Sequence, residues 1–263
     1  MVSLAALEQR RATLEGLRAA LAAGYRAASP EAFTLAEESV VRSGLGTLDA
    51  ALGGGFPRGV VATLEGAPGS GRSAVAARLL ASATAGGGLG AIVEAPAGPE
   101  GSFYPPALVA AGVDLERLLV VRAGDAASIA RAADILLRSA AFGIVVIPAL
   151  ELRATVWTRL ASLTHRANAL LLAIGSTASD ELRYFASLRV RLQPAQVRFA
   201  GESGLFCAVA GIDVEAAVLK HKRAAPGRRA HFSCATFEHS GAPLCALRER
   251  SLENATRAAA VAW

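Results

Sequence analysis

The chain of 263 residues is long enough for one large α/β domain with a sizeable core. Hydrophobic residues make up 53% of it and aromatic residues only 5%, so we expect a core built largely from Ala, Leu and Val. No apolar stretch approaches the roughly 18 residues of a membrane span, and three cysteines without a C-x-x-C pair argue against a disulfide framework, so we expect a cytoplasmic protein with no membrane contact. The net charge of +5 comes mostly from scattered basic residues and leaves both an acidic partner and nucleic acid open.

The first predicted element is an amphipathic helix within residues 1–28. Ser3 is a suitable N-cap, and Gly24 ends a run of leucines at helical spacing, namely Leu4, Leu7, Leu14, Leu17 and Leu21. This leucine face can pack against its own domain or dock on a neighbouring subunit. We therefore treat these leucines as candidate interface residues.

A phosphate-binding loop is the clearest motif. Residues 43–59 predict a short helix capped at Thr47 and a glycine turn, and residues 60–65 predict an apolar strand. Residues 66–73 then have the P-loop spacing G-x-x-x-x-G-K-[ST], with Arg72 in place of the lysine. Arginine keeps the positive charge but is bulkier and planar. The candidate nucleotide-binding residues are Gly66, Gly69, Gly71, Arg72 and Ser73.

Strand-like and helix-like segments alternate through the middle of the chain. Apolar runs at residues 90–95, 143–147 and 169–174 predict strands, and residues 73–85, 126–140 and 152–168 predict helices. This alternation is typical of a mainly parallel sheet with helices on both faces. Four short alternating runs at residues 189–193, 196–199, 205–209 and 212–220 predict an antiparallel extension of that sheet, and residues 244–263 predict a weak terminal helix.

Several sequence segments between residues 43 and 234 resemble, in the same order, segments of the ATPase core of RecA-family recombinases. They are the run from Ser43 to the P-loop, the phrase Gly112-Val113-Asp114 before Leu118-Leu119-Val120, residues 182–189, and Lys220-x-Lys222 before Ala224-Ala225-Pro226. The resemblance implies a RecA-like P-loop core over residues 29–242. An N-terminal helix (1–28) and a partner-binding tail (243–263) would flank it.

The resemblance also identifies the positions that carry the family's chemistry. In a working RecA-type ATPase, a lysine of the P-loop binds the phosphates and a glutamate after the second strand orients the attacking water. An aspartate at the end of a later strand holds the magnesium ion through its coordination shell. Here these positions hold Arg72, Pro96 and Ile147. We therefore expect no catalytic residues, no bound metal and no hydrolysis, while ATP binding stays open. Glu94 or Glu100 is an alternative water-orienting residue, although a displaced carboxylate points elsewhere.

The segments that match the family's DNA-binding loops, residues 148–152 and 176–181, are short and lack positive charge, so strand exchange is not expected. In the recombinase filament the matching K-x-K reaches the neighbouring subunit's nucleotide. Here it is either such an interface or a solvated strand end. A weak DNA contact stays open at this basic run. The candidate interface residues therefore also include Lys220, Lys222 and Arg223. Trp263, in the predicted partner-binding tail, is a further candidate.

A RecA-like core without hydrolytic residues or DNA loops is similar to the ImuA proteins, accessory factors of bacterial mutagenic translesion synthesis. The resemblance implies a non-catalytic module of the SOS response to DNA damage that binds RecA, an ImuB-type polymerase adaptor and, through it, an error-prone polymerase complex. A DNA-dependent ATPase of the RecA family and a SulA-type cell-division inhibitor are the alternatives. The sequence leaves the oligomeric state open.

Overall fold

The computed structural model describes residues 39–95, 98, 101–200, 208–224, 226–235 and 247–249. All of them fall in the second of the two units into which the chain divides, residues 35–263. The predicted N-terminal helix, Pro96, Glu100 and Trp263 lie outside the described residues. Within these ranges, no helix is both long and apolar enough to cross a membrane.

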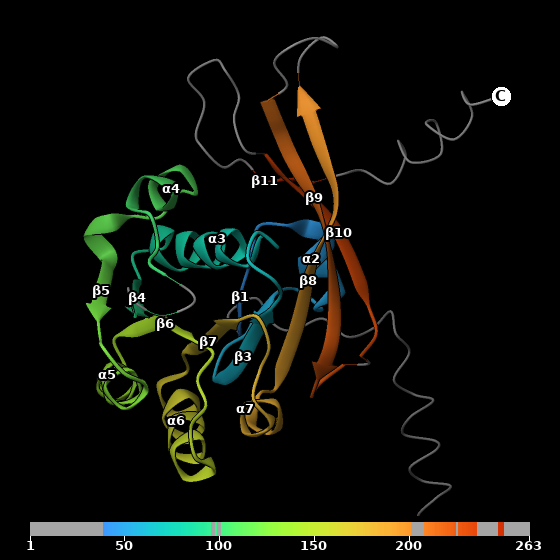
Figure 1. Cartoon of the computed structure of the whole chain (residues 1–263). Helices are drawn as coiled ribbons and strands as arrows, with labels where there is room; N and C mark the ends of the chain where they lie inside the picture. Colours follow the sequence, from blue (N-terminus) through green and yellow to red (C-terminus); the bar gives the residue numbers. More distant parts are fainter. Residues whose placement is uncertain are drawn as a thin grey trace, which may run out of the picture. The chain divides into compact units, whose positions relative to one another are not determined.

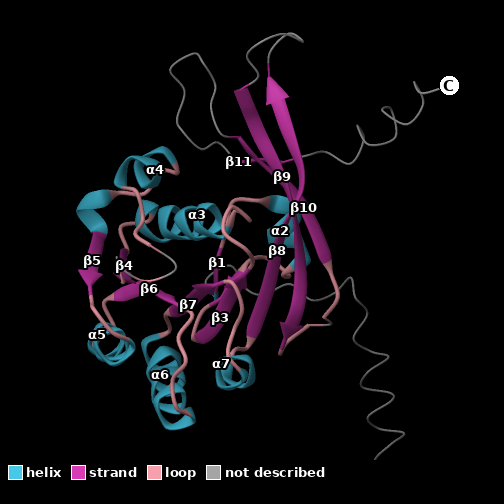
Figure 2. Ribbon diagram, viewed as in Figure 1, coloured by secondary structure: helices cyan, strands magenta, loops and turns pink. Residues whose placement is uncertain are grey.

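A nine-stranded sheet forms the centre of the molecule, with the order β11-β10-β9-β8-β3-β7-β6-β4-β5 (Figures 1 and 2). Its parallel part contains β3 (Val60–Glu65), β4 (Leu89–Glu94), β5 (Leu118–Arg122), β6 (Phe142–Pro148) and β7 (Leu170–Gly175). The first four residues of β8 (Leu188–Ala200) also pair in parallel with β3. The antiparallel part continues with β9 (Ala208–His221), β10 (Arg229–Ala235) and β11 (Leu247–Glu249). The predicted α/β class with an antiparallel extension is confirmed.

Helices cover both faces of the parallel strands (Figure 2). The helix α3 (Arg72–Ala85) packs on one face, where Leu79 and Leu80 join the side chains of Ala62 and Leu64 from β3. The helices α5 (Ala126–Arg138) and α6 (Ala154–Ala167) cover the other face around the fully buried Trp157. The central strands are apolar on both faces because both faces are buried. Shorter elements complete this part of the chain: β1 (Val40–Val41), α2 (Gly46–Ala51), β2 (Phe56–Pro57), α4 (Pro105–Ala110), the 3-10 turn η2 (Leu115–Arg117) and α7 (Asp180–Phe185).

The start of α2 differs from the sequence-based prediction. Thr47 is not its cap, because the helix already begins at Gly46 and the Thr47 hydroxyl donates to the His231 carbonyl at 3.0 Å. The carboxylate of Asp49 instead organises the preceding turn, where it accepts from the Ser43 backbone N–H at 2.9 Å and from the Ser43 hydroxyl at 2.8 Å. Burial raises the pKa of Asp49, and these hydrogen bonds act in the opposite direction.

The antiparallel extension also differs in detail. The two predicted strands at 189–193 and 196–199 are one strand, β8, which passes through Pro194 with a register shift between Pro194 and Gln196. Proline is tolerated there because β8 pairs with β3 only as far as Arg191, so beyond that point one side of the strand needs no N–H donor. In the predicted terminal helix, residues 247–249 are instead the strand β11, paired with β10.

Candidate functional site

The P-loop connects the end of β3 to the start of α3, as the sequence predicts. Its fold depends on Gly69 and Gly71, whose φ angles of +80° and +87° are unfavourable for other residues. The N–H of Gly66 donates to the Gly175 carbonyl at 3.1 Å, and that of Ser70 to the Ala67 carbonyl at 3.1 Å. The loop therefore presents backbone N–H groups and the positive end of the α3 dipole, which together form an anion-binding geometry.

Arg72 occupies the first position of α3 with only 6% of its surface exposed. A P-loop lysine reaches phosphate oxygens as a compact charge on a flexible stem, whereas this planar guanidinium is buried in the fold. The Ser70 hydroxyl beside it is also buried and has no hydrogen-bond partner among the described residues. The backbone of the loop has a geometry that fits a phosphate group, while the buried Arg72 side chain does not extend from the fold as a P-loop lysine does.

Beside Ser73 lies a small cavity of about 30 Å³, at the ends of β4, β6 and β7. Ile147, only 1% exposed, is in its wall at the position where magnesium would need an aspartate. Glu94 is the carboxylate among the described residues that line it, and Glu94 is already engaged. Its Oε2 accepts from the Phe103 backbone N–H and its Oε1 pairs with Arg122 Nε, both at 3.1 Å. This wall does not fit a magnesium ion.

Glu65, the last residue of β3, forms a buried ion pair with Arg189 of β8. The Nε to Oε1 and Nη2 to Oε2 distances are 2.8 Å and 3.0 Å, and the Thr63 hydroxyl adds a third hydrogen bond at 2.9 Å. Burial raises the pKa of Glu65, but the hydrogen bonds from Arg189 and Thr63 outweigh it and lower the pKa below its ordinary value of 4.5. A carboxylate held in this way is structural, because its acceptor positions are already used.

The segments that match the family's DNA loops are short. Residues 149–153 and 175–181 line a groove of about 760 Å³ at the carboxyl edge of the sheet. The exposed charged residues of this groove are Glu151, Asp180 and Glu181 against Arg153. A nucleic-acid backbone needs the opposite balance of charge. The absence of strand exchange through these loops stays a prediction.

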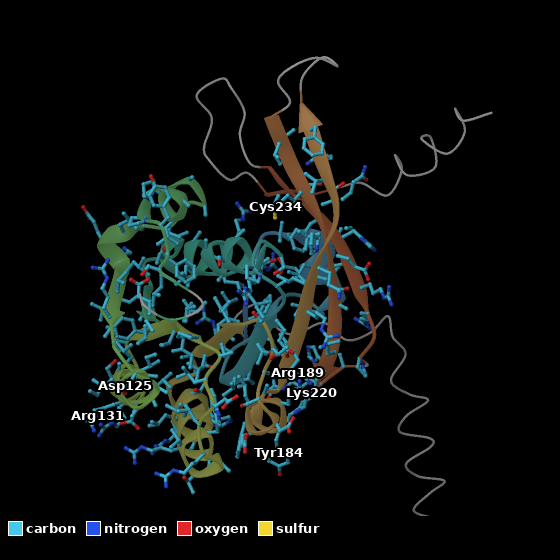
Figure 3. All side chains as sticks on the ribbon, viewed as in Figure 1. Asp125, Arg131, Tyr184, Arg189, Lys220 and Cys234 are labelled. Carbon is cyan, nitrogen blue, oxygen red and sulfur yellow. The ribbon has the colours of Figure 1, made fainter. Side chains whose placement is uncertain are left out.

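The candidate lysines lie at the opposite edge of the sheet, next to the amino end of β3. Figure 3 shows Lys220 near Arg189, with Tyr184 at α7 below them. The Lys220 ammonium donates to the carbonyls of Arg183 and Tyr184 at 2.7 Å and 3.0 Å, so it binds the C-terminal end of α7. Burial lowers the pKa of Lys220, and the charges of Lys222 and Arg189 lower it further.

The predicted site residues thus separate into two groups. Gly66, Gly69, Gly71, Arg72 and Ser73 come together at the carboxyl edge, and Lys220, Lys222 and Arg223 at the amino edge. Glu65 and Glu94 were missed as partners of arginines. A sequence signal for both exists, since each is a glutamate at the end of an otherwise apolar strand.

Comparisons with known proteins relate these features to one group. The family model for the RecA N-terminal domain matches residues 32–157. Protein RecA of Picosynechococcus sp. is 30% identical over an alignment of 231 residues that covers 74% of this chain and 64% of that protein. Protein RecA of Nostoc punctiforme is 41% identical over 107 residues, 41% of this chain and 29% of that protein. The chain spans less than two thirds of the length of these curated relatives.

A solved structure shows the same fold. The crystal structure of the RadB recombinase superposes on 81% of this chain and 100% of its own, with a TM-score of 0.59 and 18% sequence identity. At that identity the likeness concerns the fold alone.

Proposed function

Because the chain is a RecA-family recombinase-like protein whose chemistry positions have changed, we propose that it is a non-catalytic accessory protein of the DNA-damage response. It supports error-prone translesion DNA synthesis by binding RecA and an ImuB-type polymerase adaptor, and through them an error-prone polymerase complex. Its RecA-shaped surface docks on RecA, and its C-terminal tail binds the adaptor.

The observation that carries this proposal is the composition of the wall beside Ser73. Ile147 replaces the anionic anchor of a metal, and Glu94 is paired with Arg122 and the Phe103 N–H. Hydrolysis needs a metal and a group that orients water, and losing the latter alone slows such a reaction by on the order of a hundredfold. The P-loop is retained as part of the fold, and any ATP that it binds is not hydrolysed.

Exposed apolar side chains at the outer edge of the sheet support a protein-binding role. In β5, one of the two edge strands of the described sheet, Leu119 and Val120 are 44% and 43% exposed. Tyr104, Val109 and Ile135 on the neighbouring segments are also exposed. An apolar edge strand is a template for pairing with another chain, and natural proteins usually protect it. These exposed apolar residues are better explained by a bound protein partner than by exposure to water.

The decisive experiment measures binding of the full chain to RecA and to an ImuB-type adaptor, with deletions of residues 1–28 and 250–263. The second deletion starts at residue 250 because β11 ends at Glu249 and belongs to the sheet. We expect each deletion to weaken at least one complex by tenfold or more, as about 1.4 kcal/mol of lost contact would. If neither deletion weakens either complex, the flanking segments do not bind these partners.

The two alternative functions are tested with the same protein. ATP turnover stimulated by single-stranded DNA, above that of an Arg72→Ala variant, would establish a DNA-dependent ATPase and contradict the proposal. Recovery of the division tubulin instead of RecA in a pull-down would favour a SulA-type inhibitor. We expect neither result.

A further inference from the structure

A second cavity lies at the edge of the sheet opposite the P-loop. It has a volume of about 320 Å³, at the lower end of the range of ligand pockets, roughly 300–1,000 Å³. We call it the amino-edge pocket. It lies at the amino end of β3, and the residues that define it here are Val60, Val61, Ala161, His165, Phe185 and the turn 221–223.

The floor of the amino-edge pocket is apolar. Val61 of β3, Ala161 of α6 and Phe185 of α7 line it. The Phe185 ring stands edge-to-face against the ring of Tyr184, with centroids 5.1 Å apart, and Tyr184 is 75% exposed. An exposed tyrosine beside an apolar hollow is typical of protein interfaces, where aromatic residues are enriched.

The rim of the pocket is basic, and its backbone is held in place. The N–H of Lys222 donates to the Ser187 carbonyl at 2.9 Å, and the N–H of Arg223 to His221 Nδ1 at 3.1 Å. These bonds fix the turn after β9, while the Lys222 and Arg223 side chains extend outward without a hydrogen bond or ion pair to any described residue. Lys220 differs, because α7 already binds its ammonium group.

No described residue that lines the pocket carries a carboxylate. The helix α6 has no acidic residue in its whole length and contributes His165 to the rim. Asp180 and Glu181 of α7 lie in its first turn, while Phe185 at its other end lines the pocket. The positive charge at this edge is therefore not neutralised locally among the described residues.

We propose that the amino-edge pocket binds an acidic segment of a partner protein. An apolar side chain of that segment enters the hollow over Phe185 and Val61, and its flanking carboxylates pair with Lys222 and Arg223. Charge complementarity selects the occupant, since the pocket combines an apolar floor with an uncompensated basic rim. The inference rests on the proposed function only in that the protein works by binding another protein.

Single-stranded nucleic acid fits this surface less well. Such sites follow the strand backbone over about 4–16 nucleotides with stacking platforms along a groove. Here Lys222 and Arg223, which have no ion pair with any residue that the structure describes, share one turn, and the Phe185 ring lies in a T-shaped contact with Tyr184 at the wall of the pocket. An acidic peptide matches this compact arrangement.

The test uses the full chain and a fluorescent octapeptide, Glu-Asp-Asp-Leu-Phe-Asp-Glu-Glu, in an anisotropy titration at low salt. We expect saturable binding that weakens about tenfold or more in a Lys222→Glu, Arg223→Glu double variant, since a like charge replaces each pairing group. Arg166→Glu is the matched charge control, because Arg166 lies on α6, is exposed and is outside the pocket lining. It should weaken octapeptide binding much less than the double variant does. A second peptide with Gly-Ser in place of Leu-Phe should bind more weakly if the hollow is filled.

Three results would overturn the inference: no binding of the octapeptide, equal weakening by Arg166→Glu, or tighter binding of a thymidine 20-mer that the double variant abolishes. The last would assign the pocket to nucleic acid. Failure here is distinguishable from failure of the proposed function. A chain that binds RecA but not the octapeptide lacks only the pocket function, and the reverse result contradicts only the role with RecA.

Discussion

Glu65 and Arg189 form a two-pronged ion pair that joins the P-loop strand to the antiparallel part of the sheet. Both N–O distances are at or below 3.0 Å, and the Glu65 carboxylate is almost completely buried. The pair lies directly before Gly66, so it fixes the point where the loop leaves the strand. We therefore expect the ion pair to contribute to the free energy of unfolding.

Arg189→Met should destabilise the protein strongly, because it leaves the Glu65 carboxylate buried without its partner. Breaking one side of a buried pair typically costs about 3–5 kcal/mol. Urea denaturation followed by circular dichroism measures the change. Asp180→Asn removes one partner of the exposed pair with Arg183 and should change stability much less. Similar effects of both substitutions would contradict the buried role of Arg189.

The same carboxylate should make stability fall in acid. Because the folded protein lowers the pKa of Glu65 below 4.5, its stabilising contribution is complete above about pH 4.5 and is lost as the pH falls through the folded value. The free energy of unfolding, measured at several pH values below 5, should decline less steeply in Glu65→Gln than in the wild type. Parallel curves would show that Glu65 does not titrate in this way.

Gly66→Ala should destabilise the loop and the sheet beside it. A Cβ atom at residue 66 would lie 2.4 Å from the Leu192 carbonyl oxygen and 2.9 Å from Ser70 Cβ, so the backbone would have to move. We expect a loss of about 1–3 kcal/mol, as for other overpacked sites. Gly86→Ala is the matched control, because nothing lies within 4 Å of its Cβ position and its φ is −85°. A thermal melt in which both variants behave alike would contradict the close approach.

Trp157→Ala should cost about 3–5 kcal/mol, since the side chain is fully buried between α6 and the sheet. Trp157→Phe should cost clearly less. It keeps much of the apolar volume and removes an indole N–H that has no hydrogen-bond partner among the described residues. Chemical denaturation of the two variants gives the comparison. Equal losses would indicate that the N–H has an unrecognised partner.

His221 should make the fold less stable as the pH falls below about 6.5. Burial lowers its pKa from 6.5, and the nearby charges of Arg228 and Arg223 act in the same direction. The unfolded chain therefore binds a proton first, and the free energy of unfolding decreases through the interval between the two pKa values. His221→Gln should flatten this part of the stability curve between pH 7 and pH 5. The exposed His165→Gln on α6 serves as the control, and an identical flattening there would refute the assignment.

The local chemistry of the sequence was sufficient for the parallel core. The run at residues 60–65 is β3 with the same bounds, because a strand buried on both faces is mostly apolar along its length. The P-loop followed from glycine spacing, since Gly69 and Gly71 supply the left-handed backbone that the turn needs. These features depend on residues that are close together in the sequence, so the local sequence pattern predicts them.

Contacts between distant residues were not accessible in this way. Lys220 binds the C-terminal end of α7, 36 and 37 residues earlier, and Thr47 bonds to a carbonyl 184 residues away. Residues 189–193 and 196–199 were predicted as two strands, but β8 continues through Pro194 because only one of its sides is paired there. The strand β11 was missed because its pairing with β10 joins separate stretches of the chain, and three residues carry too little pattern of their own.

The strand β3 separates two unlike edges, with the P-loop at one end and the turn of Lys222 and Arg223 beside the other, roughly 20 Å apart for six residues. The surfaces at the two ends of β3 are therefore chemically different. A neighbour bound at the P-loop end leaves the turn of Lys222 and Arg223 exposed, and a neighbour bound at that turn leaves the P-loop end exposed, so the two modes of contact present different surfaces.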